Sequence, residues 1–294
     1  MLYVLSEFFK FYLKDFYMLY LVSTPIGNLK DISDRAKETL AGVDLIACED
    51  TRTTGTLLNL LGVKHGSLTA YHEHNADKVR PSLIEKLKKG VQIALVSDAG
   101  TPLVSDPGFR LVRECRSQNI PVTTVPGANA VLSALQLSGL PSDSFYFGGF
   151  LPPKSVARIQ TLQGIKDLPA TVIFYDTPNR LMATLKDILT ALGNRQMAVV
   201  REITKKFEET RLDTVQNLID YYTENGEPKG EIVLVIAKAD KSQQMMSEAY
   251  IDELILKTLK TSSVRDVAQI VSQITGVPKK QIYKRVVELN GQSS

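Results

Sequence analysis

The chain has 294 residues, which is long enough for two hydrophobic cores. Of these residues, 44% are hydrophobic and 23% are charged, so wholesale disorder is excluded. Its net charge of +3 is too small to prove a nucleic-acid partner and does not exclude one, because a basic patch can be local. The two cysteines, Cys48 and Cys115, form no CxxC pattern, which argues against a disulfide scaffold or a cysteine-rich zinc site and fits a reducing cytoplasm.

Residues 1–17 are rich in aromatic and aliphatic side chains, but charged residues interrupt them. No run approaches the roughly 20 apolar residues of a membrane span, and no signal-peptide pattern is present, so we expect no membrane association. We interpret this segment as an N-terminal extension. Two alternatives are open: a dispensable or mis-assigned start before Met18, and a short amphipathic helix on the surface.

Residues 18–140 alternate strand and helix patterns and are predicted to form the first α/β domain. Val79, Leu83 and Leu87 recur every four residues, which predicts a helix over 76–89. The run VQIALVS has almost no polar break, as expected of a strand covered on both faces of a mostly parallel sheet. The β-rich runs predict strands at 19–23, 43–48, 67–71, 91–97 and 120–125.

A turn cluster at 140–144 is the predicted boundary to a second α/β domain over 141–240. Several strands follow one another directly here, so a mixed sheet is expected. The predicted strands cover 145–150, 171–175, 197–202 and 231–237, and the predicted helices cover 154–166, 178–192 and 214–224.

Residues 241–294 are predicted to be a polar linker, KSQQMMS, followed by a small helical tail. Ser262 or Ser263 can cap one helix, and a turn at 276–278 precedes a last helix. Two interpretations of this helical hairpin are open. It is a packing appendage, or it contacts RNA or the ribosome through Lys279, Lys280, Lys284 and Arg285.

Four loops rich in Gly, Pro and polar residues follow predicted strands of the first domain, where open α/β sheets bind ligands. Neither GxGxxG nor GxxxxGK[ST] is present, which argues against a Rossmann dehydrogenase and a P-loop NTPase. The four loops together predict a small-ligand site built largely from main-chain groups. They are STPIGNL (23–29), EDTR (49–52), SDAGTP running on to SDPG (97–108), and PGAN (126–129).

His72 and His74, in the segment YHEHN, would share one face of a strand, where a metal site is conceivable. Because no third ligand is evident nearby, we predict no metal site.

Eight sequence blocks resemble the signature blocks of the 16S rRNA cytidine 2′-O-methyltransferases, a group within the tetrapyrrole-methylase superfamily. The resemblance spans about residues 19–239 in the right order, and the tail is similar to the C-terminal helical piece of that group. The blocks are STPIGNLKDIS, LIACEDTRTT, ALVSDAGTPLVSDPG, VPGANAVLSAL, GFLPPK, FYDTPNRL, REITKKFEE and KGEIVLVI.

The resemblance implies two α/β domains of the tetrapyrrole-methylase type with S-adenosylmethionine in the cleft between them, and a homodimer. It also implies, as the target, the ribose 2′-hydroxyl of a decoding-centre cytidine in 16S rRNA within the small ribosomal subunit, and hence a cytoplasmic protein. The residues implied to hold the cofactor are Pro25, Asp98, Ala99, Gly100, Val104, Ser105, Ala128, Tyr175 and Pro228.

The EDTR loop is expected to lie beside the acceptor nucleotide. Arg52 can hold a phosphate there while Glu49 or Asp50 orients the hydroxyl. The alternative is an internal ion pair between Arg52 and its acidic neighbours. Further substrate contacts are expected from His74, Asn75, Lys205 and Glu208, and the bases considered for the 2′-hydroxyl proton are Glu49, Asp50, Asp98 and Glu208.

An aromatic side chain is expected to stack on a base of the RNA, with Tyr71, Phe150, Phe174 and Phe207 as equal candidates. Two rival functions are kept. One is a methylase of the same fold that acts on a tetrapyrrole or a protein side chain, although TPIGN replaces the glycine-rich turn usual in tetrapyrrole methylases. The other is a non-catalytic RNA-binding factor.

Overall fold

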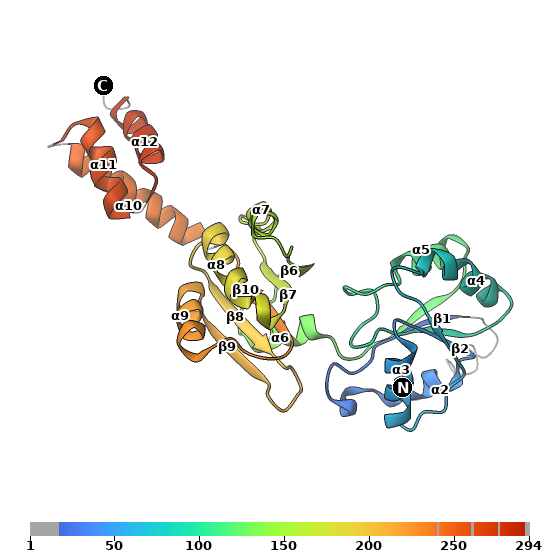
Figure 1. The fold of residues 1–294 in the computed structure, drawn as a ribbon. Coiled ribbons are helices and arrows are strands. Elements are labelled where there is room, and N and C mark those ends of the chain that lie inside the picture. The colour runs from blue at the N-terminus through green and yellow to red at the C-terminus, as the bar shows by residue number, and fades with distance from the viewer. Residues whose placement is uncertain (1–17, 240, 260–261, 276, 292–294) are drawn as a thin grey trace, which may run out of the picture. The chain divides into compact units, whose positions relative to one another are not determined.

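The computed structural model describes residues 18–239, 241–259, 262–275 and 277–291 (Figure 1). These residues form two compact units, one ending at Lys238 and the other beginning at Ala239. The first unit holds two five-stranded sheets, and the second holds three helices. The α/β fold class predicted from the sequence is confirmed.

The first sheet is parallel throughout, as predicted, with the strand order β3-β2-β4-β1-β5. Alternate residues of each strand enter different cores: Leu45 and Ala47 pack under helices α4 and α5, and Ile46 and Cys48 pack under α2 and α3. The strands are β1 (Leu19–Val22), β2 (Leu45–Cys48), β3 (Ser67–Ala70), β4 (Ile93–Leu95) and β5 (Val122–Val125). The helices are η1 (Leu29–Asp31), α2 (Asp34–Gly42), α3 (Thr51–Leu60), α4 (Ala76–Lys88) and α5 (Phe109–Ser117).

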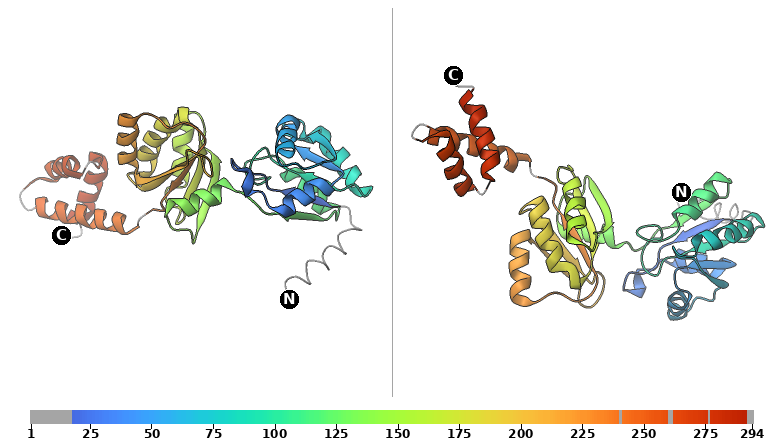
Figure 2. Two further views of the ribbon diagram at one scale, coloured as in Figure 1. Left: turned by 90° about the horizontal axis from the view of Figure 1, so that it is seen from below. Right: turned by 45° about the horizontal axis from the view of Figure 1, so that its top comes forward.

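The second sheet is mixed, as predicted, with the order β6-β7-β10-β8-β9; only β6 and β7 run parallel. Helices α7, α8 and α9 cover one face and α6 covers the other (Figure 2). The strands are β6 (Phe145–Phe150), β7 (Thr171–Asp176), β8 (Gln196–Arg201), β9 (Glu209–Thr214) and β10 (Ile232–Ile236). The helices are α6 (Ala130–Ser138), α7 (Ser155–Gly164), η2 (Pro178–Arg180), α8 (Leu181–Leu192) and α9 (Val215–Asn225).

Helix α6 precedes the turn at 140–144 in the sequence but packs against the second sheet, where Val131 and Ala134 meet Val233 and Val235. The chain therefore leaves the first sheet at the end of β5. A domain boundary at 140 stays a prediction.

Gly148 keeps the bulged strand β6 against its neighbour. A Cβ added there would overlap the ring of Phe174, which is 1% exposed and cannot move aside. We expect Gly148→Ala to lower the free energy of unfolding by about 1–3 kcal/mol, as overpacking a filled core does. Urea unfolding would measure this. Gly164→Ala is the matched control, because nothing lies within 4 Å of its added Cβ, and a midpoint shift equal in both variants would contradict the packing argument.

The second unit contains α10 (Lys241–Leu259), α11 (Val264–Thr275) and α12 (Lys279–Gly291) around a small apolar core. Ser263 caps α11: its Oγ accepts a hydrogen bond from the Asp266 amide (3.3 Å), so one of the two predicted caps is confirmed. The prediction of a linker at 241–247 was wrong, because that segment is the first part of α10. Lys, Gln and Met favour helix, and no Gly or Pro interrupts them.

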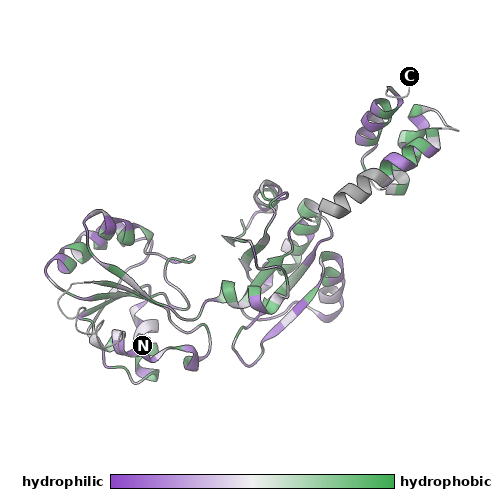
Figure 3. Cartoon of the chain, turned by 180° about the vertical axis from the view of Figure 1, so that it is seen from behind, coloured by the Kyte–Doolittle hydropathy of each residue, from purple (hydrophilic) through white to green (hydrophobic). Residues whose placement is uncertain are grey.

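Figure 3 shows that the strands of both sheets are mostly apolar and that the helices have one polar face. This is the pattern of amphipathic helices that cover buried sheets. No helix among the described residues combines the length and apolar composition needed to cross a membrane. Residues 1–17 lie outside the described residues, so both interpretations of that segment stay predictions.

Candidate active site

The loops after β1, β4 and β5 are joined by hydrogen bonds. The amides of Thr24 and Gly100 donate to each other's carbonyls (2.9 and 3.0 Å), with Gly100 at a φ of 84° that favours glycine. The Thr24 hydroxyl donates to the Ser97 carbonyl (3.1 Å), and the Thr101 hydroxyl donates to the Ala128 carbonyl (3.1 Å). These bonds fix the backbone of three loops at one edge of the sheet.

A cavity of about 510 Å³ opens at this edge, a size typical of small-molecule sites. Loops that follow strands of the first sheet line one side of it, residues in and next to the second sheet line the other, and most of the wall is apolar. The lining residues are Ile26, Asp98, Ala99, Gly100, Thr101, Val104, Ser105, Asp106, Asn129, Ala130, Phe150, Tyr175, Asp176, Thr177, Pro178, Ile203, Gly230, Glu231, Ile232 and Val233.

Six of the nine residues expected to hold a cofactor line this cavity: Asp98, Ala99, Gly100, Val104, Ser105 and Tyr175. Pro25, Ala128 and Pro228 do not line it. Pro25 instead separates the paired Thr24 from the lining Ile26, and Ala128 contributes its carbonyl to the loop frame. The sequence reasoning missed Asp106, Asp176 and Glu231, although each stands in one of the quoted blocks.

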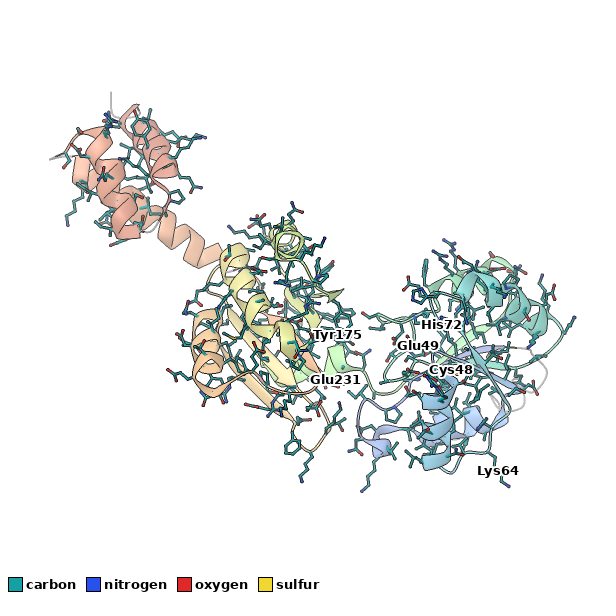
Figure 4. The ribbon with its side chains drawn as sticks, viewed as in Figure 1. Cys48, Glu49, Lys64, His72, Tyr175 and Glu231 are labelled. Atoms are coloured by element: carbon teal, nitrogen blue, oxygen red, sulfur yellow. The ribbon has the colours of Figure 1, made fainter. Side chains whose placement is uncertain are left out.

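The carboxyl group of Asp106, which lines the cavity, has a raised pKa. Burial, together with the negative charges of Glu49 and Asp98 and against a hydrogen bond from Ser97, raises its pKa to about 6. Burial and Asp98 also raise the pKa of Glu49, while the nearby His72 lowers it. The sheet order explains this grouping, because Glu49, His72 and Asp98 follow the adjacent strands β2, β3 and β4. Figure 4 shows Glu49 and His72 near each other in the first-sheet part of the chain.

Asp176 borders the same cavity, but its side chain is fully buried. Its Oδ1 accepts a hydrogen bond from the Thr177 amide (2.9 Å) and lies 3.6 Å from Nε of Arg180, and its Oδ2 has no hydrogen-bond partner among the described residues. Burial, together with the charges of Asp106 and Glu231, raises the pKa of the neighbouring Tyr175 to about 12. The cavity thus combines apolar walls with acidic groups suited to a cationic or hydrogen-donating ligand.

Comparison with known proteins places the chain among methylases. The family model described as Tetrapyrrole (Corrin/Porphyrin) Methylases matches residues 18–219, and the model described as RsmI C-terminal HTH domain matches residues 246–290. Proteins named ribosomal RNA small subunit methyltransferase I are similar along almost the whole chain. The relative from Mesorhizobium japonicum is 47% identical over 94% of this chain and 93% of its own length. The relative from Haemophilus influenzae is 45% identical over 91% of this chain and 95% of its own.

The chain belongs to the ribosomal RNA small subunit methyltransferase I family, within the tetrapyrrole methylases.

Solved structures with the same fold include a diphthine synthase (14% identity, TM-score 0.58, 76% of this chain and 90% of that chain). They also include a uroporphyrin-III C-methyltransferase from Thermus thermophilus complexed with S-adenyl homocysteine (17% identity, TM-score 0.51, 75% of this chain and 97% of that chain). At such identities the likeness supports the tetrapyrrole-methylase fold alone.

In this member of the family, Asp50 and Arg52 bind each other. Asp50 caps α3 by accepting from the Arg52 amide (2.8 Å) and also accepts from the guanidinium (2.8 Å). These bonds lower the pKa of Asp50 to about 2. The ion pair considered as the alternative for Arg52 is therefore present, although the Arg52 side chain is 90% exposed.

The other residues expected to contact the substrate differ in how many hydrogen bonds they already make within the protein. Asn75 closes a turn, accepting from the His72 amide (2.9 Å) and donating to the Ala70 carbonyl (3.0 Å). Lys205 donates to Glu202 and Glu231 (3.0 and 3.1 Å), and Glu208 accepts from the Thr204 amide (2.5 Å). His74 is exposed.

The described residues contain no group of three or more His, Cys, Asp or Glu side chains that could hold a metal. Both cysteines, Cys48 under α3 and Cys115 on α5, are buried free thiols whose pKa burial raises. In the second unit, Arg285 is paired with Asp252 (2.6 Å) and Lys279 bonds Gln269 (2.9 Å). Lys280 and Lys284 are exposed on α12.

Proposed function

We propose that the protein transfers a methyl group from S-adenosylmethionine to the ribose 2′-hydroxyl of a decoding-centre cytidine in 16S rRNA. The observation that carries this proposal is the similarity of almost the whole chain to small-subunit rRNA methyltransferases, together with the loop-framed cavity. A ribosomal substrate implies a cytoplasmic protein.

The cavity fits the cofactor in size and chemistry. Its apolar wall, with Ile26, Val104 and Ile232, suits an adenosine, and the polar backbone of 98–105 suits hydrogen bonding to it. When bound, the cofactor supplies an electrophilic methyl carbon on a sulfonium.

The protein then has two tasks, which are to align the 2′-hydroxyl and to accept its proton. Alignment in a water-excluding site can lower a barrier by roughly 7–11 kcal/mol. For the proton, Asp50 is a weak base because its pKa is about 2, and Glu208 is engaged by Thr204. Asp106 lines the cavity and has a pKa of about 6, so it is ionised at neutral pH yet basic enough to accept the proton. We assign this role to Asp106, with Glu49 raising its basicity.

The proposal includes a homodimer. Three leucines on α6 and the adjacent strand β9 are exposed: Leu132, Leu137 and Leu212 are 48%, 41% and 46% exposed. Exposed large apolar side chains on neighbouring elements favour a protein partner. Light scattering on the purified protein would give twice the 32.5 kDa chain mass for the dimer and the single mass against it.

The deciding experiment is transfer of labelled methyl from S-adenosylmethionine to small ribosomal subunits that lack the modification, with free 16S rRNA in parallel. Label at one decoding-centre cytidine, mapped by resistance to alkaline cleavage, is the expected result. A cofactor-binding protein that labels neither RNA would contradict the proposal and point to a tetrapyrrole or protein acceptor. Absence of cofactor binding would favour the non-catalytic RNA-binding factor.

Arg52→Ala is expected to raise the KM for the RNA about threefold to tenfold. An exposed guanidinium that contacts a phosphate contributes to the affinity of the protein for RNA, and salt weakens this contribution. Cofactor affinity, measured by calorimetry, should stay the same, since Arg52 does not line the cavity. Lys37→Ala, which removes a partly exposed cation of helix α2, is the control. A loss of cofactor affinity in folded Arg52→Ala would show that the assignment is wrong.

A further inference from the structure

The turn between β8 and β9, residues 202–208, carries an exposed aromatic side chain that the reaction does not use. We propose that this turn is a binding site for an unpaired nucleotide of the RNA, with the base stacked on Phe207 and the phosphate beside Lys206. The inference rests on the proposed function and adds to it a place where the RNA is held.

The structure separates the four aromatic candidates for stacking. Tyr71 and Phe174 are each 1% exposed and belong to the cores. Phe150 is exposed but lies in the cavity wall, with its ring 5.4 Å from that of Tyr175. Phe207 is 62% exposed outside the cavity wall, and the ammonium of Lys206 lies 5.5 Å from its ring centre. Only Phe207, among these four, is a largely exposed ring outside the wall of the cofactor cavity.

The backbone of this turn is held in a conformation that side-chain-bearing residues rarely adopt. Glu202 and Thr204 have φ values of 50° and 64°. Such residues persist only where the surroundings enforce them, and they cluster at functional sites. Here the Glu202 carboxylate accepts from the Glu231 amide and from Lys205 (both 3.0 Å), and the Glu208 carboxylate accepts from the Thr204 amide. The turn therefore presents Phe207 on a fixed backbone, which limits the entropy lost on binding.

The same turn is anchored next to the cavity. Ile203 and Glu231 line the cavity, and the Thr204 hydroxyl donates to Asp31 in η1 (2.6 Å). The Lys205 stem passes so close to Gly27 that a Cβ there would lie 2.5 Å from Lys205 Cγ. Lys205 is thus a structural residue of the turn, and Phe207 follows the lining Ile203 by only four positions.

Aromatic stacking suits an unpaired RNA base, because every base has a π face and the phenyl ring makes no demand on its edge. The adjacent lysine adds a phosphate contact without sequence preference. A target ribose that reaches the cavity leaves its neighbouring nucleotides at the rim, and the turn would hold one of them. The chemistry therefore fits an unpaired nucleotide next to the acceptor cytidine.

The test compares Phe207→Ala, Phe207→Trp and Phe145→Ala, the last removing a phenylalanine that is 43% exposed at the far end of β6 from Phe150. With unmodified small subunits as substrate, Phe207→Ala should raise KM about tenfold or more while kcat and cofactor affinity change little. Phe207→Trp should restore KM, and Phe145→Ala should match the parent. A KM of Phe207→Ala within about twofold of the parent, in protein with an unchanged melting temperature, overturns the proposal.

A second measurement separates this proposal from the proposed function. A single-stranded RNA oligomer containing 2-aminopurine should change its fluorescence on stacking with the parent protein, and the change should be lost in Phe207→Ala and kept in Phe145→Ala. That outcome supports the stacking site even if the parent methylates no ribosomal RNA. An equal fluorescence change in the parent and Phe207→Ala overturns the stacking site even if methylation is observed.

Discussion

Replacing Asp106 by asparagine is expected to lower kcat for methyl transfer at neutral pH about a hundredfold to ten-thousandfold, the usual range for removal of a general base. Asparagine keeps the shape of the side chain but cannot accept the 2′-hydroxyl proton. Calorimetric titration with S-adenosylmethionine should show that cofactor affinity is largely kept. Asp34→Asn, at a carboxylate that is 92% exposed on α2, should leave kcat unchanged.

The pH dependence gives the same assignment an independent test. Because the pKa of Asp106 is about 6, its carboxylate forms as the pH rises through 6, so kcat should rise through this range and level off above it. Glu49→Gln removes a negative charge that raises this pKa, and the midpoint should then move to lower pH. A profile that keeps its midpoint in Glu49→Gln, or a kcat for Asp106→Asn near that of the parent, would mean that another group accepts the proton.

Replacing Arg158 by methionine is expected to lower the free energy of unfolding of the first unit by about 3–5 kcal/mol, because it leaves a buried partner charge uncompensated. Arg158 is 3% exposed, and its guanidinium lies 2.6 Å from Oδ2 of Asp187, whose side chain is 13% exposed. The same guanidinium donates to the carbonyls of Pro152 and Pro153 (3.3 and 3.2 Å). It therefore ties α7 and α8 to the segment that follows Phe150 of the cavity.

Chemical unfolding followed by circular dichroism would measure this loss. Lys186→Met, at an exposed position of α8 beside Asp187, should change stability by no more than about 0.5 kcal/mol. The double variant Arg158→Met with Asp187→Leu should recover much of the loss, since it removes both charges. A double variant no more stable than Arg158→Met would show that the carbonyl contacts, and not the ion pair, dominate.

The repeating parts of the fold could be predicted because local patterns are strong there. The run VQIALVS predicted a strand covered on both faces, and β4 lies at the centre of the parallel sheet. Strand β9 was not predicted, because ETRLDT is polar and has no apolar run. It is an edge strand, and its pairing with β8 stabilises the extended conformation that its composition does not favour. The packing of α6 on the second sheet depends on contacts between distant segments, which no local pattern encodes.

The site could be predicted only where the residues of a loop themselves indicated a ligand-binding turn. Glycine and proline marked the loop at 97–102, and Asp98 and Gly100 line the cavity. Asp106 stood in the segment SDPG, but its raised pKa comes from burial and from Glu49, which follows another strand. Phe150 was named only as a candidate for base stacking and Ile203 was not named at all, because an apolar residue near a strand end is more often a core residue than a cavity residue. The partnership of Arg52 with Asp50 was one of two open alternatives, and only the atomic contacts decide it.

The reactivity of the two buried thiols can report how often the first sheet opens. Cys48 and Cys115 are the only cysteines of the chain, and both pack on that sheet, one in each of its two cores. A thiol-specific alkylating agent should therefore modify the native protein slowly, at the rate at which this sheet opens. Mass spectrometry after brief alkylation would then report the opening of the first sheet separately from that of the second, without any added label.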